Sequence, residues 1–443
     1  MLIDHCLMWW RFVLVSVALA FGCTKPNPLS CADGTCTDPT LPFCDVNGEV
    51  EGQAGTCIAV ACEPGTFQAC RGDLAITCNI AGSDFDLLQC ARGCDDALGG
   101  CNACTAHAQC PSRICKPDGA CAAENEITYA EAAGASVSDC TVDSPCTLER
   151  ALELPAPSAG QFILVGAGVH QSARPYLITG RRTIVGVDAV QTVVKGLVAG
   201  SVVLIEAGAT VSLEQVQITG GIFDGTIGDG KGVECPLMPL GPRVLRVVDA
   251  AISDNEEHGL FANGCTVDLL RSRFERNGFA GAEINIGNVI VDRCSFSSNG
   301  QAGLHVAPSS DVTVTNSLMY RNATGAFLFP GTNSTIFDFN TIVDNGVGLD
   351  CASAQPANNL IARNDTNTTG TAGGPACTHP GSLITADIAP IKFKSPDVEP
   401  FDYHLSAGST AIDAALDSSL DHDFDGEPRP SAASRDIGAD EAH

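Results

Sequence analysis

The chain has 443 residues, 44% of them hydrophobic, which is enough for two or three domains with a sizeable core. Acidic residues outnumber basic residues by 52 to 24, and the formal net charge is −28 at neutral pH. A surface of this charge repels nucleic acid and anionic lipid. It also disfavours polyanionic polysaccharides, unless calcium bridges the two negative partners.

The chain begins with a segment typical of an export signal. Its apolar run over residues 12–21 is too short to span a bilayer. The run leads into Cys23, and the residues around it resemble a bacterial lipobox, with Ala20 where leucine is commoner. That resemblance implies that residues 1–22 are a lipoprotein signal peptide and that Cys23 is acylated, which would attach the chain to the bacterial cell envelope. An ordinary signal peptide is the alternative, and Met8 is an alternative start.

A cysteine-rich section follows a short extended tether at residues 23–30. Of the 23 cysteines, 14 lie in this section, over residues 31–123. Only Cys101 and Cys104 have CxxC spacing, so disulfides in an exported protein are favoured over zinc. The section has few aromatic residues and must rely on cross-links, whose connectivity the sequence does not give. We expect three small modules that act as a spacer, with protein binding as the alternative: Cys31–Cys57, Cys62–Cys101 and Cys104–Cys121.

Cysteines become sparse from residue 124 onward. Cys140 and Cys146 are expected to close a loop before a short helix over residues 147–152. Irregular apolar strands follow between residues 162 and 218. A loop at residues 223–242 then interrupts the pattern, and inserts of this kind often build binding sites. Within it, Cys235 is a candidate disulfide partner of Cys265.

The stretch from Val244 to Cys351 repeats itself every 22 or 23 residues. Each repeat has an asparagine, a bulky apolar residue three positions before it, and a glycine three or four positions after it. The asparagines are Asn255, Asn277, Asn299, Asn322 and Asn345. The apolar residues are Ile252, Phe274, Phe296, Met319 and Ile342. The glycines are Gly259, Gly281, Gly303, Gly325 and Gly348, each followed by leucine or alanine.

This period fits one coil of a stacked β-solenoid and is too short for an array of helical hairpins. Residues 289–292 and 312–315 alternate in polarity and are rich in β-branched side chains, as strands are. Equivalent positions then stack about 4.8 Å apart, so columns of like residues become continuous ladders. Stacked asparagine amides can satisfy one another, and the glycines mark corners that need positive φ or close backbone approach.

The repeats CSFSSNGQAGLHV (294–306) and NTIVDNGVGL (340–349) resemble those of right-handed parallel β-helix proteins of the pectate-lyase-like superfamily. The resemblance implies an all-β fold, with a right-handed parallel β-helix over residues 124–393 preceded by the disulfide-rich modules. Residues 147–152 are similar to the N-terminal cap helix of secreted β-helices, which covers the open first coil. The resemblance does not specify an activity, because this fold hosts lyases, hydrolases, epimerases and adhesins.

Past Cys351 the repeat degrades, and Cys351 with Cys377 is a further disulfide candidate. Residues 394–443, with DHDFDGEPRPSAASRDIGADE, resemble the closing segment of bacterial secreted β-helix proteins, which implies a C-terminal cap without known chemistry. The matching positions are Asp413, Asp425, Gly426, Arg429, Asp436, Gly438 and Glu441.

Within this segment, Asp421, Asp423 and Asp425 alternate before a glycine, as at the opening of a calcium loop. A helix-loop-helix site would need a glutamate where Ala432 stands. A solvated acidic turn is therefore favoured over calcium, and we expect no other cofactor.

One outward-facing column of the solenoid is the best place for a functional site. It consists of Phe261, Glu283, His305, Phe327 and Asp350. Adjacent coils would place Glu283 about 5 Å from His305. Aromatic faces beside a carboxylate and an imidazole suit neutral sugars, and such a pair can serve as acid and base if it lies buried in a groove. The alternative is an ordinary half-exposed strand.

The catalytic patterns that the resemblance implies are incomplete. Pectate lyases hold calcium with clustered aspartates and use an arginine as base. Here Asp292, Arg271 and Arg293 fall on a neighbouring face, and Asp338 is two coils from Asp292. Polygalacturonases use an aspartate pair and a Gly-His-Gly turn, which residues 257–259 match only at His-Gly.

We therefore expect an envelope-anchored lipoprotein whose β-helix serves surface adhesion or glycan contact without catalysis. A polysaccharide lyase or glycoside hydrolase is the alternative. The expected partners are the membrane, through the N-terminal lipid, and a glycan or another surface protein, but not nucleic acid.

Overall fold

The computed structural model describes residue 31 and residues 35–443, with short gaps. The gaps are 46–53, 60, 64, 80–81, 91–92, 97–98, 157–159, 226–229, 238–240, 308–310, 330–334, 352–353, 371–376 and 432–433. The expected signal peptide, Cys23 and tether lie outside the described residues. Two compact units are present: one runs up to Pro111 and includes Cys115–Cys121, and the other comprises Ser112–Ile114 and Ala122–His443. No helix in the described part of the chain is both long and apolar enough to cross a bilayer.

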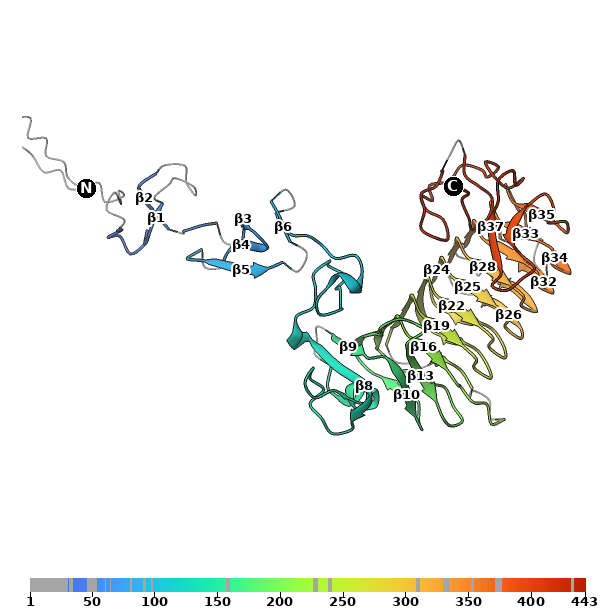
Figure 1. Ribbon diagram of the computed structural model, residues 1–443, viewed down its shortest axis with the longest axis horizontal. Coiled ribbons are helices and arrows are strands. Elements are labelled where there is room, and N and C mark those ends of the chain that lie inside the picture. Colours follow the sequence, from blue (N-terminus) through green and yellow to red (C-terminus); the bar gives the residue numbers. More distant parts are fainter. Residues whose placement is uncertain are drawn as a thin grey trace, which may run out of the picture. The chain divides into compact units, whose positions relative to one another are not determined.

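The first unit, whose strands are labelled in Figure 1, is cross-linked within each of the three expected modules. Its disulfides are Cys31–Cys44, Cys36–Cys57, Cys62–Cys78, Cys70–Cys94, Cys90–Cys101, Cys104–Cys115 and Cys110–Cys121. Its strands are β1 (Phe43–Asp45), β2 (Thr56–Ile58), β3 (Phe67–Arg71), β4 (Leu74–Cys78), β5 (Phe85–Gln89), β6 (Cys94–Asp95) and β7 (Gly100–Cys101). The predicted disulfide-rich N-terminal section is confirmed.

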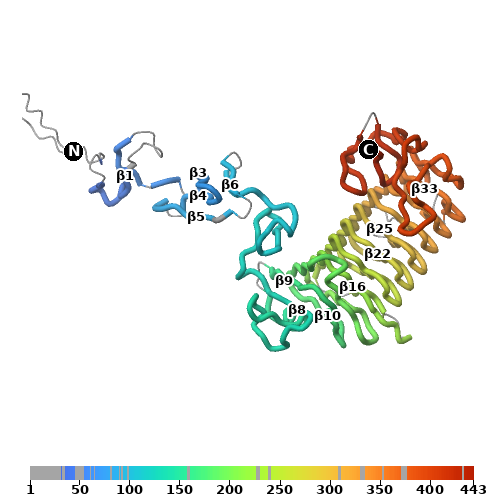
Figure 2. Tube along the Cα trace, viewed as in Figure 1, coloured from blue at the N-terminus to red at the C-terminus, as the bar shows by residue number. Residues whose placement is uncertain are grey.

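The second unit is a coil of three parallel sheets, whose successive turns are easiest to follow in Figure 2. Sheet 1 contains β8 (Ile127–Ala135), β9 (Gln161–Val165), β12 (Arg181–Val185), β15 (Thr210–Glu214), β18 (Arg243–Val248), β21 (Cys265–Leu270), β24 (Val289–Asp292), β27 (Val312–Thr315) and β30 (Thr335–Asp338). Sheet 2 contains β10 (Gly168–Ser172), β13 (Thr192–Gly196), β16 (Gln217–Thr219), β19 (Ala251–Ser253), β22 (Arg273–Glu275), β25 (Ser295–Ser297), β28 (Leu318–Tyr320), β31 (Thr341–Val343), β33 (Leu360–Ala362) and β35 (Leu383–Thr385). Sheet 3 contains β11 (Tyr176–Ile178), β14 (Val203–Ile205), β17 (Val233–Cys235), β20 (Leu260–Asn263), β23 (Ala282–Ile286), β26 (Ala302–Val306), β29 (Thr324–Leu328), β32 (Val347–Cys351) and β34 (Thr366–Thr369).

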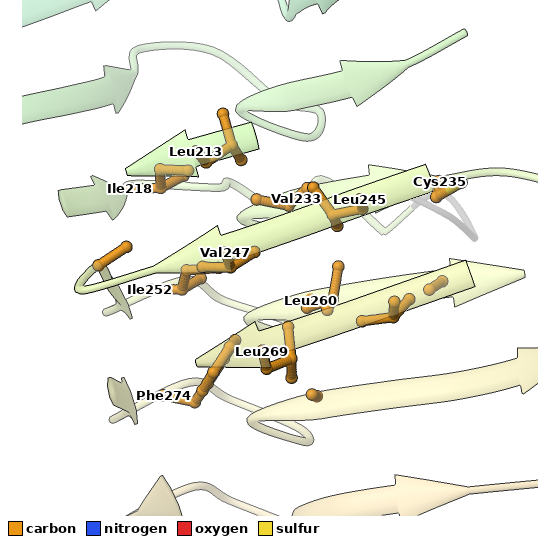
Figure 3. Close-up of a cluster of buried hydrophobic side chains, with 14 of the residues drawn as sticks. Leu213, Ile218, Val233, Cys235, Leu245, Val247, Ile252, Leu260, Leu269 and Phe274 are labelled. Carbon is orange, nitrogen blue, oxygen red and sulfur yellow. The ribbon is translucent and has the colours of Figure 1, made fainter. Parts of the chain in front are cut away.

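The core lies between the three sheets and is built from the apolar columns of the repeat. Figure 3 shows Leu245, Ile252 and Leu260, from the three consecutive strands β18, β19 and β20 of one coil, directed into it. Phe274 and Phe296 are fully buried, and their stacked rings lie 5.0 Å apart between centroids. The apolar column Ile252, Phe274, Phe296, Met319 and Ile342 pairs in register from coil to coil. The predicted all-β solenoid is therefore confirmed.

The asparagines form one continuous ladder at the corner between sheets 2 and 3. Each Nδ2 donates to the Oδ1 of the next asparagine over 2.9 to 3.1 Å, and the ladder continues beyond the expected five to Asn364. Positive φ belongs to the residue before each asparagine, such as Arg276 at 55°. The repeat glycines serve close approach instead, because a Cβ on Gly281 would lie 2.7 Å from the Gly303 carbonyl oxygen. The glycines were expected to supply either positive φ or close backbone approach, and the structure shows close backbone approach.

A second ladder, which the sequence did not reveal, lines the corner between sheets 1 and 2. Asn340 Nδ2 donates to Asn359 Oδ1 at 3.1 Å, and Asn340 Oδ1 accepts the Ser317 N–H at 3.0 Å. Earlier coils place Cys294 and Ser272 at this position, and the Ser272 hydroxyl accepts the N–H of Ala250. The column mixes residue types, which concealed it in the sequence.

The short helix expected before the first coils is α1 (Leu148–Glu153). The Thr147 side chain caps it by accepting the N–H of Arg150 at 3.2 Å. The helix buries its apolar face, including Ala151, in the main core. Arg182 from β12 donates to carbonyl groups at the C-terminal end of the helix, which fixes α1 against the first coils.

The closing segment packs against the outer face of sheet 2, whereas we expected it to close the end of the coil stack. Its strands β36 (Phe393–Ser395) and β37 (Asp402–Leu405) form an antiparallel pair. Outward-facing Val343 and Ala362 are apolar and share a second core with this segment, which explains why a side face needs a cover. The Gly438 N–H donates to the Asn358 carbonyl oxygen at 2.9 Å.

Candidate functional site

The outward column predicted from the sequence lies on β20, β23, β26, β29 and β32 of sheet 3. Its residues pair directly in register, in the order Phe261, Glu283, His305, Phe327 and Asp350. We call this column the lateral strip. The first four residues are half-buried, but Asp350 is only 8% exposed, so the strip is less exposed at that end than expected.

Glu283 lies at the centre of the lateral strip between two imidazoles. Its Oε2 is 3.3 Å from His305 Nδ1 and 3.7 Å from His258 Nδ1. Its Oε1 accepts a hydrogen bond from Asn285 Nδ2 at 3.2 Å. His258 reaches this position from the corner before β20, and it is 8% exposed. The structure thus joins the expected Glu283–His305 pair to a third titratable group.

Burial and hydrogen bonding set the charges of this group. Burial lowers the pKa of His258 to about 4, against the opposing effect of Glu283, so His258 is neutral at pH 7. For Glu283, burial favours a higher pKa, but the hydrogen bond with His305 and the nearby imidazoles outweigh it and lower the pKa overall. Glu283 is therefore an ionised carboxylate at neutral pH.

The longer coil that contains β17 places Lys231 in a second group of charged side chains beside the strip. Lys231 Nζ lies 3.4 Å from Glu234 Oε1 and 3.7 Å from Glu257 Oε2, and its side chain is 4% exposed. It also lies 5.1 Å from the ring centroid of Phe261. Lys231 and Glu234 both come from the 223–242 segment, which was expected to interrupt the coil. The structure shows instead that this segment supplies β17 and extends the strip by one coil, with Glu234 opposite Phe261.

Aromatic rings flank the charged groups. His305 contacts Phe327 edge-on at 4.9 Å between ring centroids, and Phe327 contacts Phe329 at 4.4 Å. His258 lies 5.4 Å from both Phe261 and Phe279. The surface therefore offers apolar ring faces beside carboxylate and imidazole groups. Sequence reasoning missed Lys231 and Glu234 because their longer coil breaks the 22-residue spacing, and it missed Phe279 because that position holds different residues in the other repeats.

The three aspartates of the possible calcium loop have separate partners. Asp421 is exposed and pairs with His422 Nδ1 at 2.8 Å. Asp423 is buried, and its two oxygens accept the backbone N–H groups of residues 425, 427 and 441. Asp425 Oδ2 lies 2.7 Å from His404 Nε2. Asp423 thus organises the turn through backbone hydrogen bonds.

The remaining candidate residues have structural positions. The expected pairs are bonded as Cys140–Cys146, Cys235–Cys265 and Cys351–Cys377. Arg271 pairs with Asp249, and Arg293 with Asp292, on the corner between sheets 1 and 2. These arginines therefore lie away from sheet 3, which carries the lateral strip and Glu283.

One family model matches the coil region. Residues 241–385 match the family model for the right handed beta helix region. Similar solved structures include pectate lyase Pel9A, with 14% identity, a TM-score of 0.47, and coverage of 72% of this chain and 96% of that chain. The A-module of the Azotobacter vinelandii mannuronan C-5 epimerase AlgE4 has 15% identity and a TM-score of 0.29, with 58% and 94% covered. A rhamnogalacturonan lyase has 12% identity and a TM-score of 0.27, with 61% and 91% covered.

No curated protein matches the chain significantly. The three-sheet coil of the second unit is a parallel β-helix fold, and residues 241–385 within it match the right-handed β-helix model, as the repeats predicted.

Proposed function

We propose that the lateral strip binds a glycan and that the protein serves surface contact rather than turnover of that glycan. The observation that carries the proposal is the Glu283–His305 pair at 3.3 Å, with Phe327 packed edge-on against the imidazole. Sugar rings present apolar C–H faces to aromatic rings and hydroxyl groups to carboxylates. The coil spacing of about 4.8 Å is close to the length of one sugar unit in an extended chain. Another surface protein is the alternative partner.

A glycan array with the full chain tests this proposal. We expect Phe327→Ala to weaken binding of the array hits about three- to tenfold, which is the usual contribution of one aromatic contact. Ile290→Ala is the matched control, because Ile290 is an exposed apolar residue on sheet 1. A blank array, or equal binding by Phe327→Ala and the unaltered protein, would refute glycan binding by the strip.

One observation favours a second candidate function, a polysaccharide lyase or glycoside hydrolase. A neutral imidazole at His258 and an ionised carboxylate at Glu283 lie within 3.7 Å, and both can accept a proton. Reducing-sugar and unsaturated-product assays on the bound glycans test it. Turnover that Glu283→Ala abolishes would support an enzyme, and no turnover of any bound glycan would exclude one.

We also propose that acylated Cys23 anchors the protein to the cell envelope. The support is the apolar run of residues 12–21 that ends beside Cys23, together with the disulfides, which need an oxidising compartment. The three cross-linked modules would then act as a spacer between the lipid and the β-helix. Metabolic labelling with a fatty-acid analogue checks the anchor: the unaltered protein should take up label, and uptake by Cys23→Ser would contradict it.

A further inference from the structure

The charges along the lateral strip indicate what kind of glycan it can accept. The strip and its immediate surroundings carry more carboxylates than cations. The carboxylates are Glu234, Glu257, Glu283 and Asp350, and the only permanent cation among these groups is Lys231. Four of them lie on, or just before, β17, β20 and β23 in neighbouring coils, and Asp350 lies on β32, three coils beyond Glu283.

Lys231 does not neutralise the negative charge of Glu283 at the middle of the strip. Its ammonium group pairs with Glu234 and Glu257, and its side chain is almost fully buried. Glu283 instead contacts His258, His305 and Asn285, none of which carries a permanent charge. Since Glu283 is only 18% exposed, its charge acts in a medium less polar than water, where it is felt more strongly.

The aromatic rings of the strip are suited to a cation. Phe261 already holds the Lys231 ammonium 5.1 Å from its ring centroid. Phe327 lies three coils beyond Phe261 and two coils beyond Glu283, on the far side of His305. A cationic group on Glu283 would therefore have aromatic rings on both sides along the strip. A uronate carboxylate at the same place would face like charge, which the net charge of −28 would reinforce.

We propose that the glycan bound by the strip contains amino sugars with free amino groups, and that one sugar ammonium group pairs with Glu283. This inference rests on the glycan binding proposed above and adds its substrate class. Acidic polysaccharides are excluded from the strip by the same charges. The neutral N-acetylated form of the sugar fits the rings but loses the ion pair.

Three hexamers of graded charge test the proposal on the full chain: β-1,4-glucosamine, its fully N-acetylated form and galacturonate, titrated by calorimetry in the presence of EDTA. We expect the glucosamine hexamer to bind about two- to fivefold more tightly than the N-acetylated hexamer, which is the gain typical of one partly exposed ion pair. Added salt should reduce this preference, and the galacturonate hexamer should not bind.

Glu283→Gln should remove the preference for the amine over the N-acetylated hexamer, because the change removes the charge and little volume. Glu275→Gln on β22 makes the same change on sheet 2, where Glu275 pairs with Arg276, and should leave the preference intact. A preference that survives in Glu283→Gln would contradict the assigned ion pair.

The outcomes separate this inference from the proposed function. Equal binding of the amine and N-acetylated hexamers, or calcium-independent binding of galacturonate, would overturn the substrate class while glycan binding stands. Binding of none of the three, with other glycans bound on the array, would have the same meaning. A blank array would remove both proposals.

Discussion

Single amide side chains connect the coils of this protein at the residue scale. Asn299 Nδ2 donates to Asn322 Oδ1 and to the Phe274 carbonyl oxygen, while its Oδ1 accepts from Asn277. The side chain is almost fully buried, at 3% exposure. Removing it leaves donors and acceptors of three coils without partners, and water cannot easily replace it.

We predict that Asn299→Ala lowers the free energy of unfolding by about 2–4 kcal/mol, because two or more buried polar groups lose their partners. Urea denaturation followed by circular dichroism measures this loss. Asn288→Ala is the control, since Asn288 is exposed and should change stability by less than about 0.5 kcal/mol. Equal effects of the two substitutions would show that the ladder contributes little.

The lowered pKa of His258 predicts that the stability of the protein depends on pH. Its pKa is about 4 in the folded protein and about 6.5 in an unfolded chain. Between these values the unfolded chain binds more protons, so the free energy of unfolding decreases as the pH falls from about 7 to 4. The decrease due to His258 is on the order of 3 kcal/mol.

Chemical denaturation at several pH values between 4.5 and 7 measures this dependence. His258→Asn should flatten the decline, because asparagine does not titrate. The other histidines are common to both proteins, so the difference between the two profiles isolates His258. Parallel profiles would mean that His258 titrates normally in the folded state.

The coil is the element that the sequence predicts best. Residues such as Phe274 and Phe296 recur at a fixed spacing because equivalent positions face the same core, so spacing alone gives their register. The Ser272–Asn340 corner was not predictable, because different polar residues can fill the same hydrogen-bonding role. Lys231 was missed for another reason: its coil is longer, which breaks the period although the strand pairing continues through β17.

The cysteine-rich modules differ from the coil in what holds them together. Each closes its own disulfides, such as Cys62–Cys78, and has little apolar core. The β-helix has a continuous apolar core that extends through all its coils, together with the asparagine ladder. We predict that mild reduction of the full chain makes the region before residue 122 sensitive to proteolysis while the β-helix resists.

Limited proteolysis with and without reductant, read by mass spectrometry, tests this difference. The expected product under reducing conditions is a resistant fragment that begins near residue 122. Digestion of both units at the same rate would indicate that the disulfides Cys140–Cys146, Cys235–Cys265 and Cys351–Cys377 are also essential to the coil.

At the scale of the second unit as a whole, one buried ion pair holds the closing segment in shape. Arg429 Nη1 lies 3.0 Å from Glu441 Oε2, and both side chains are completely buried. Glu441 also accepts the backbone N–H groups of Asp436 and Ser431. Removing one charge of such a pair leaves the other buried without compensation.

We predict that Glu441→Gln lowers the free energy of unfolding by about 3–5 kcal/mol and loosens the cover over sheet 2. Hydrogen–deuterium exchange should then become faster in β31 and β33, whose outer faces the segment covers. Glu427→Gln is the matched control, because the Glu427 side chain is 52% exposed. Unchanged exchange in both strands would show that the segment does not depend on this pair.

Because each coil contacts chiefly the coils next to it, the molecule can change length in whole-turn steps. One complete repeat is, for example, the 22 residues from Phe274 to Ser295. After its removal Ile252 would pair with Phe296 in place of Phe274, which is the same residue type. Phe261 would pair with His305 in place of Glu283, which is a side chain of similar bulk. Relatives with more or fewer turns would therefore differ in the length of the lateral strip, while the two ends of the β-helix stay the same.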